Sequence, residues 1–262
     1  MLMAKQNNMK NVEVLFEMGA HLGHNKSRLH PKARKNVYQI VNKTSIIDLT
    51  KTIKQLDAAK KYLAQIATDG KSILVVGTKK TASAFVKEYC ASKNISYISS
   101  KWLPGLLTNY KMIMKNVKKL KDMREQITTG EAKVLVKHER TQMSKKIAKL
   151  ERLFSGIELM DKRPECMVIV DIRKEKNAVK EAQEFNIPIV GIADTNADPN
   201  TIEYPVVAND DDSEVVKHIM TELLEEYSSN LNIAEPTAAS KTSPKTEPKV
   251  AQPVEQKTEP KK

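Results

Sequence analysis

The stretch from residue 71 to residue 80, Lys-Ser-Ile-Leu-Val-Val-Gly-Thr-Lys-Lys, restricts the fold more than any other part of the chain. Residues 73–76 form a short, continuous apolar run rich in β-branched side chains, which is typical of a strand buried on both faces. Gly77 then allows a sharp turn, Thr78 can cap a helix, and residues 82–89 have a helical pattern. The stretch therefore predicts the opening of a βαβ unit.

The same alternation of strand and helix recurs along much of the chain. Further strands are predicted at about residues 95–98, 167–170, 187–192 and 206–207, with helices at about 175–185 and 213–227. This alternation predicts an α/β fold with a doubly wound parallel sheet. The turn after the first strand has Lys79 and Lys80 where a dinucleotide-binding protein has glycines, which favours a basic rim over a cofactor cradle.

Three local elements are predicted before this strand. Residues 11–18 have the pattern of a short amphipathic helix, residues 37–40 and 45–49 that of a hairpin around Asn42-Lys43, and residues 51–67 that of a longer helix. The side chains predicted to face inward from the first helix are Val14, Leu15 and Met18.

Residues 21–32 are rich in histidine, glycine and charge, so we predict an irregular loop that carries contacts. Its histidines, His21, His24 and His30, are potential zinc ligands. No cysteine or carboxylate lies nearby in the sequence to complete a tetrahedral site. We therefore favour loop-structuring hydrogen bonds or nucleic-acid contact over a metal.

Residues 101–109 interrupt the alternation, because Pro104-Gly105 predicts a turn and Thr108 or Asn109 can cap a helix. Two series of apolar residues then recur at spacings of three and four. They are Tyr110, Ile113, Val117 and Leu120 and, after a turn region, Met143, Ile147, Leu150, Phe154 and Ile157. Two such series predict an antiparallel coiled-coil hairpin inserted in the α/β domain.

The chain carries 44 basic and 32 acidic residues, a formal net charge of +12, which indicates a polyanionic partner. Residues 106–155 alone hold 13 basic and 5 acidic side chains. Two basic stripes follow from helical spacing on the predicted hairpin: Lys111, Lys115 and Lys118 on the first helix, and Lys145, Lys149 and Arg152 on the second. Because only 5% of residues are aromatic, phosphate contact is a better explanation than base stacking.

Four regions are predicted along the chain. Residues 1–105 form the first part of the α/β domain with an N-terminal extension, residues 106–160 the helical hairpin, and residues 161–228 the second part of the α/β domain. Residues 229–262, rich in proline, lysine and glutamate, are predicted to be a disordered tail. Cys90 and Cys166 lack a CxxC partner, which indicates buried, reduced thiols and a cytosolic protein. No run is long and apolar enough for a membrane helix, so no membrane partner is expected.

Two other functions deserve comparison with a polyanion-binding protein. Asp171, Asp194 and Asp198 follow predicted strands and, with Lys79, could hold Mg²⁺ for phosphoryl transfer, but no phosphate-binding or nucleophile motif accompanies them. The hairpin could instead dock another coiled coil. Its apolar seam is used by its own packing, however, and the charge that remains outside suits phosphates better.

Several motifs, in order along residues 14–227, closely resemble the bacterial small ribosomal subunit protein S-two family. They are Gly-Ala-His-Leu-Gly-His at 19–24, Ile-Ile-Asp-Leu at 46–49, Val-Val-Gly-Thr-Lys-Lys at 75–80, Trp-Leu-Pro-Gly-Leu-Leu-Thr-Asn at 102–109, and Asp-Thr-Asn-Ala-Asp-Pro at 194–199. The resemblance implies a Rossmann-like (flavodoxin-like) sheet with a protruding coiled coil, and neither catalysis nor a cofactor. It also implies contact with 16S ribosomal RNA and neighbouring small-subunit proteins, among them ribosomal protein S-one, on the cytoplasmic ribosome.

Trp102 is predicted to be a core residue rather than a platform on which RNA bases stack.

The predicted RNA-binding residues fall into two groups. The hairpin group comprises Lys111, Lys115, Lys118, Lys145, Lys149 and Arg152. The second group, which we call the rim, comprises His21, His24, Lys26, Arg28, Lys32, Lys79, Lys80 and Lys101.

Overall fold

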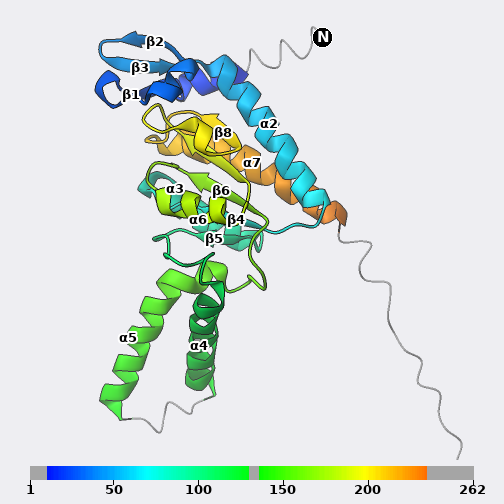
Figure 1. The fold of residues 1–262 in the computed structure, drawn as a ribbon. Helices are drawn as coiled ribbons and strands as arrows, with labels where there is room; N and C mark the ends of the chain where they lie inside the picture. The colour runs from blue at the N-terminus through cyan, green and yellow to red at the C-terminus, as the bar shows by residue number, and fades with distance from the viewer. Residues whose placement is uncertain (1–10, 130–135, 235–262) are drawn as a thin grey trace, which may run out of the picture.

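The computed structural model of the protein describes residues 11–129 and 136–234. At its centre lies a parallel sheet of five strands in the order β5-β4-β6-β7-β8 (Figure 1). The strands are β4 (Ile73–Val76), β5 (Ser96–Ile98), β6 (Cys166–Val170), β7 (Ile189–Ala193) and β8 (Tyr204–Val207). The predicted α/β fold with a parallel sheet is confirmed, and the strand order is that of flavodoxin-like, Rossmann-type folds.

Both faces of this sheet are buried, as the continuous apolar strands predict. In β4, Ile73 and Val75 belong to one hydrophobic cluster, whereas Leu74 and Val76 belong to another on the opposite face. Because successive side chains of a strand point to opposite faces, a strand covered on both sides must be apolar at every position.

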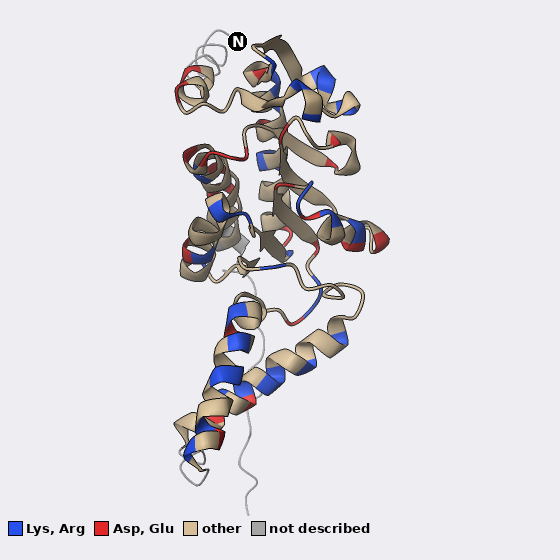
Figure 2. Cartoon of the chain, turned by 90° about the vertical axis from the view of Figure 1, so that its left-hand side faces the viewer, with Lys and Arg blue, Asp and Glu red and all other residues tan. Residues whose placement is uncertain are grey.

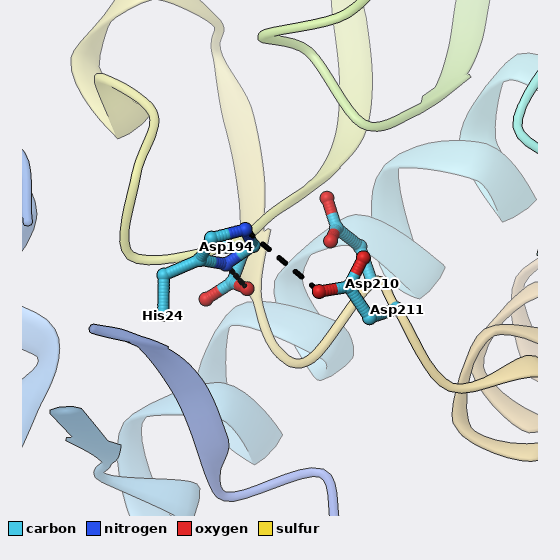
Figure 3. A group of neighbouring side chains, drawn as sticks. All are labelled: His24, Asp194, Asp210 and Asp211. Atoms are coloured by element: carbon cyan, nitrogen blue, oxygen red, sulfur yellow. Dashed lines mark hydrogen bonds and ion pairs between the residues drawn. The ribbon is translucent and has the colours of Figure 1, made fainter. Parts of the chain in front are cut away.

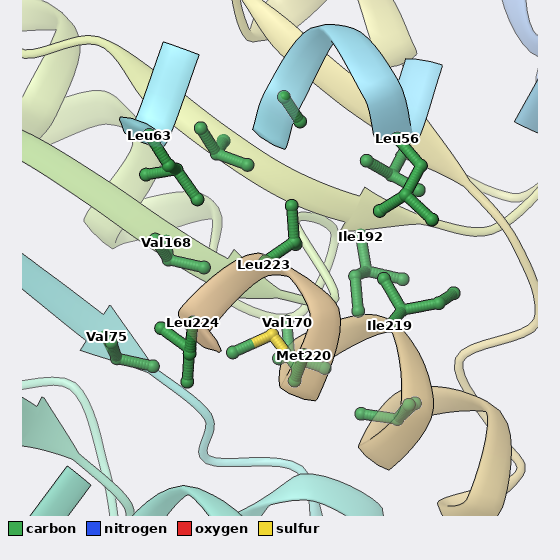
Figure 4. Close-up of a cluster of buried hydrophobic side chains, with 14 of the residues drawn as sticks. Leu56, Leu63, Val75, Val168, Val170, Ile192, Ile219, Met220, Leu223 and Leu224 are labelled. Carbon is green, nitrogen blue, oxygen red and sulfur yellow. The ribbon is translucent and has the colours of Figure 1, made fainter. Parts of the chain in front are cut away.

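Helices cover the two faces unequally. One face packs against α2 (Leu49–Thr68), α3 (Lys80–Ser92) and α7 (Ser213–Ala234), and Figure 4 shows side chains of α2 and α7 meeting those of β6 and β7. The other face packs against α6 (Lys176–Glu184) and the base of an inserted helical pair. Within the described segments, no helix is both long and apolar enough to cross a bilayer.

Gly77, after β4, serves close packing rather than an unusual backbone conformation. A Cβ built at Gly77 would lie 2.7 Å from Cγ2 of Val86 in α3. Its φ is not positive, whereas among the described glycines Gly19, Gly70 and Gly105 do have a positive φ. The strand–helix turn predicted at this glycine is present, but its physical reason is the close approach of α3.

A second, antiparallel sheet forms near the N-terminus, in the order β1-β3-β2. The hairpin of β2 (Val37–Val41) and β3 (Thr44–Ile47) is confirmed, with positive φ at Asn42 and Lys43 in its turn. The prediction of a purely irregular loop at residues 21–32 is wrong, because β1 (Leu22–Asn25) pairs with β3 there. Two 3₁₀ segments follow, η1 (Lys26–Arg28) and η2 (Pro31–Asn36).

The predicted N-terminal helix is present over the described residues 11–17. Leu15 is buried and Met18 packs against the same core. The inward orientation predicted for Val14 is wrong, because that side chain is 40% exposed. The buried stripe of this helix runs through Val12, Leu15 and Met18, a spacing of three that leaves Val14 outside.

The insertion between β5 and β6 contains two helices, α4 (Tyr110–Thr128) and α5 (Lys137–Phe154), which together we call the arm. They run away from the sheet and back toward it (Figure 1). Only Val117, Leu120, Ile147 and Phe154 are fully buried within them. The helical pair is present, whereas a coiled coil along its whole length stays a prediction.

The last helix, α7, continues past residue 228, where the tail was predicted to begin, and reaches Ala234. Along this extension the side chains of Ser228 and Asn230 donate hydrogen bonds to the carbonyls of Leu224 and Glu226, one turn earlier. The predicted disorder of residues 235–262 lies outside the described residues. The domain boundaries after residues 105 and 160 also stay predictions.

The two cysteines are free and buried. Burial raises the pKa of each thiol, Cys90 and Cys166, to about 12. They therefore stay protonated and unreactive at neutral pH, as expected of small core residues.

Candidate nucleic-acid interface

In this sheet β5 lies on one side of β4, whereas β6 and the later strands lie on the other side. In such a sheet the usual ligand position is the crevice beyond the carboxyl ends of β4 and β6, where the strand order reverses. Here that crevice contains Lys79, whose Nζ lies 2.7 Å from Oδ1 of Asp210 and 2.7 Å from Oδ1 of Asp211. Asp171, directly after β6, lies 3.8 Å from the same ammonium. The chain's own ion pairs thus occupy the place where a cofactor would bind.

Within this cluster, Asp210 is strongly buried. The side chain of Asp210 is 1% exposed, and that of Lys79 is 17% exposed. Burial, together with the nearby Asp171 carboxylate, raises the pKa of Asp210 to about 6 despite the hydrogen bond from Lys79. The same lysine lowers the pKa of the more exposed Asp211 by hydrogen bonding. Lys79 is therefore committed to neutralising carboxylates inside the protein.

His24 extends the cluster from the other sheet, as Figure 3 shows. Its Nδ1 is hydrogen-bonded to the Asp194 carboxylate at the end of β7, and its Nε2 lies 3.0 Å from Nδ2 of Asn196. Ligand atoms of His24, Asp194, Asp210 and Asp211 all lie within 4.8 Å of one another. One imidazole and three carboxylates are groups that can bind a divalent cation.

This geometry corrects one step of the sequence argument about the histidines. No carboxylate is near His24 in the sequence, yet three come from the C-terminal half of the chain. Gly23 makes the approach possible, because a Cβ there would lie 2.7 Å from Cγ2 of Thr195. The backbone N–H of His24 also donates to Oγ1 of Thr195 at 2.9 Å.

The other predicted rim residues divide into engaged and free groups. The ring of His21 stacks on that of Phe16, with 4.2 Å between the centroids, and Lys32 pairs with Asp198 at 2.7 Å. In the part of the chain that the structure describes, four exposed cations of the rim have no carboxylate within 4 Å. They are Lys26, Arg28, Lys80 and Lys101.

The arm presents its charge differently. Basic residues recur along both of its helices (Figure 2). Arg124 is engaged, with Nε 2.8 Å from Glu151 and Nη1 2.9 Å from Glu158. All six predicted arm residues are exposed, and none has a carboxylate within 4 Å among residues 11–129 and 136–234. They are Lys111, Lys115, Lys118, Lys145, Lys149 and Arg152.

The base of the arm is fixed by a residue that the sequence analysis missed. The carboxylate of Glu181 in α6 accepts hydrogen bonds from Nε1 of Trp102 at 3.0 Å and from the backbone N–H groups of Gly105 and Leu107 at 2.9 and 3.0 Å. Trp102 is 4% exposed, which confirms its predicted core position. One carboxylate therefore holds the loop from which α4 starts.

Comparisons with known proteins agree on one assignment. The sequence profile of a family described as "Ribosomal protein S2" matches residues 15–228. The "Small ribosomal subunit protein uS2" of Karelsulcia muelleri (strain GWSS) is 40% identical over 215 residues, which cover 82% of this chain and 97% of that protein. The matched region includes every arm and rim residue named above.

Proposed function

Because the chain belongs to the ribosomal protein S2 family and is a structural constituent of the small ribosomal subunit rather than an enzyme, we propose that the arm is its main grip on 16S ribosomal RNA. The observation that carries this proposal is the set of six exposed arm cations without carboxylate partners. Such cations neutralise phosphates and release counterions on binding. They position the protein without reading sequence, because side chains cannot enter the deep, narrow major groove of A-form RNA.

The proposal includes the antiparallel coiled coil predicted for the arm. The partly buried Tyr110, Ile113, Met143 and Leu150 continue the apolar seam beyond the fully buried residues. Packing along this seam would hold the two basic stripes in a fixed relation to each other. A rigid arm loses less conformational entropy on binding than a mobile one.

The rim is proposed as a second, weaker contact. Lys26, Arg28, Lys80 and Lys101 are free to approach phosphate, so they supply most of its attraction. The other predicted contacts, His21, His24, Lys32 and Lys79, already have partners within the protein, and we assign them the smaller share.

Neighbouring small-subunit proteins are further proposed partners, including ribosomal protein S-one, and the cytoplasm is the proposed compartment. Family resemblance suggests both. Two exposed aromatic side chains near the N-terminal sheet, Phe16 at 57% and Tyr38 at 72%, support a protein contact there. Aromatic residues are enriched in protein interfaces.

The test uses small subunits depleted of this protein and rebound to purified full-length chain. In the test variant, Lys111, Lys115, Lys145 and Lys149 are all replaced by Gln. In a control variant of equal charge, four exposed lysines on the body are replaced in the same way: Lys54, Lys61, Lys87 and Lys217. Cosedimentation on sucrose gradients measures the bound fraction.

We expect the arm variant to bind at least tenfold more weakly at moderate salt, since each lost phosphate contact removes counterion release. The control variant should bind within about twofold of the wild type, because surface substitutions away from an interface change little. Equal losses in both variants would show that net charge, not the arm, governs binding.

A further inference from the structure

A cavity of about 590 Å³ lies at the carboxyl edge of the sheet, beside α6. Its walls come from the η1–η2 segment, the residues after β6 and β7, and α6 itself. Such a volume is in the range of small-ligand sites. Unlike the crevice between β4 and β6, the cavity does not contain Lys79 or its carboxylate partners.

One part of the cavity wall is apolar. It consists of Leu29 and Pro31 from the N-terminal segment, Ile172 after β6, Val179 of α6, and Ala197 after β7. Ile172, Val179 and Ala197 are almost fully buried and belong to the core. This wall can cover the faces of a flat ring without moving, because its residues are fixed by packing.

The remaining wall is polar, and four of its five charged side chains are basic. Arg28, Arg173, Lys176 and Lys180 line the cavity and are exposed. Among the described residues, none of the four has a carboxylate within 4 Å. Asp198 also lines the cavity, but Lys32 already pairs with it. The cavity therefore attracts an anion that carries an apolar group.

A second, more open cavity of about 480 Å³ adjoins the first. The two share Arg28, Arg173 and Asn196 in their walls. A phosphate bound by the two arginines would thus lie between two spaces, one on each side. This arrangement fits a phosphodiester that links a nucleotide in the first cavity to a strand that continues through the second.

Two buried polar atoms in residues of the first cavity lack hydrogen-bond partners. They are Nδ1 of His30 and Oδ1 of Asn196. Buried polar atoms are normally paired, so these two are exceptions within the wall, and neither has surface open to the cavity.

We infer that the cavity formed by the η1–η2 segment and α6 binds one unpaired nucleotide of a single-stranded RNA segment. Its base would lie against the apolar wall, and its phosphate would lie on Arg28 and Arg173. The inference rests on the proposed function, and adds to it a place where an extruded base is held. A free mononucleotide is the competing occupant.

The test measures binding of a labelled ten-residue oligouridylate by fluorescence anisotropy. The chain used is the full-length arm variant with its four Lys→Gln replacements, so that the arm contributes little. Three further comparisons are made: an abasic oligomer of equal length, the double replacement Arg28→Gln and Arg173→Gln, and the control pair Lys54→Gln and Lys61→Gln. Uridine monophosphate is the competitor.

We expect about a tenfold loss with the abasic oligomer, because the base no longer buries apolar surface against the wall, and a similar loss with the double arginine replacement. The salt slope should also fall by about 0.7 in the double arginine variant, because one phosphate contact is lost. The control pair should stay within twofold. Equal binding of the two oligomers, or equal losses in the arginine and control pairs, overturns the inference.

Displacement by uridine monophosphate at concentrations comparable to the oligomer would also overturn it, because the cavity would then belong to a free nucleotide. These outcomes are separate from those of the subunit-binding test, which uses the arm lysines as its variable. The cavity inference can thus fail while the arm proposal stands.

Discussion

The cations at the sheet edge and the cations of the arm look alike in the sequence but are held in opposite ways. Lys79 lies 2.7 Å from both Asp210 and Asp211. Lys111 and Lys145 are exposed, with no carboxylate within 4 Å in the described part of the chain. Net charge thus counts toward an RNA partner only where the fold leaves a cation unpaired, and elsewhere it stabilises the protein itself.

The largest expected difference comes from removing one cation of each kind. Lys79→Gln leaves Asp210 buried without its neutralising partner, so we expect a loss of about 3 kcal/mol in the free energy of unfolding. Lys111→Gln should change it by less than about 0.5 kcal/mol. Urea unfolding of both variants measures the contrast. Equal stabilities would mean that the Lys79 cluster does not stabilise the fold.

The pH dependence of stability sharpens the same contrast. Since the pKa of Asp210 is about 6 in the folded protein and its ordinary value is 3.8, the folded state holds an extra proton between these values. The free energy of unfolding should therefore fall as pH rises from 4 to 6, by at most about 3 kcal/mol from this residue. Above pH 6 the contribution should be constant.

Asp210→Asn provides the check on that residue. The variant cannot titrate at this position, so its unfolding free energy should vary less with pH between 4 and 6 than that of the wild type. Chemical unfolding across this range gives both curves. Parallel curves would assign the pH dependence to other groups.

A smaller effect is expected at the joint between the two regions. Glu181→Ala removes the acceptor of three partly buried donors in the loop that begins the arm, at a cost of about 2 kcal/mol. Fluorescence of Trp102, the single tryptophan, reports loosening of this loop. Glu184→Ala, on an exposed position of the same helix, is the matched control and should leave the spectrum unchanged.

The smallest expected effect concerns the ion pairs within the arm. Arg124→Gln breaks its contacts to Glu151 and Glu158, which are partly exposed, so we expect a loss of about 0.5 to 1 kcal/mol. The loss should shrink in high salt, because screening already weakens these pairs. Arg140→Gln, at an exposed position of α5, should cost less. If Arg124→Gln lowered the free energy of unfolding more in high salt than in low salt, the contacts of Arg124 would not be screened ion pairs.

The body of the fold could be predicted from the sequence because its signals are local. Ile73 to Val76 and Met167 to Val170 are continuous apolar runs, and a strand buried on both faces has no other composition. The positions that failed depend on distant partners. β1 is a strand because β3 lies beside it, and its own polar sequence carries no strand signal.

The candidate site was predicted only where exposure follows from spacing. The arm lysines are exposed as helical periodicity implies. Asp210 and Asp211, by contrast, meet Lys79 only because the parallel sheet brings strand ends together across more than a hundred residues. The sequence signal available for Asp210 and Asp211 was their position shortly after the strand that ends at Val207. No comparable signal marked Glu181.

The most direct test of the arm as the grip is the salt dependence of affinity for purified 16S ribosomal RNA. Wild type, the arm variant and the equal-charge control are compared over a range of salt concentrations. Each phosphate contact contributes about 0.7 to 0.9 to the steepness of log affinity against log salt. The account therefore predicts that the slope becomes shallower by roughly three units in the arm variant, which loses four lysines, and stays unchanged in the control. Identical slopes for wild type and arm variant would contradict it.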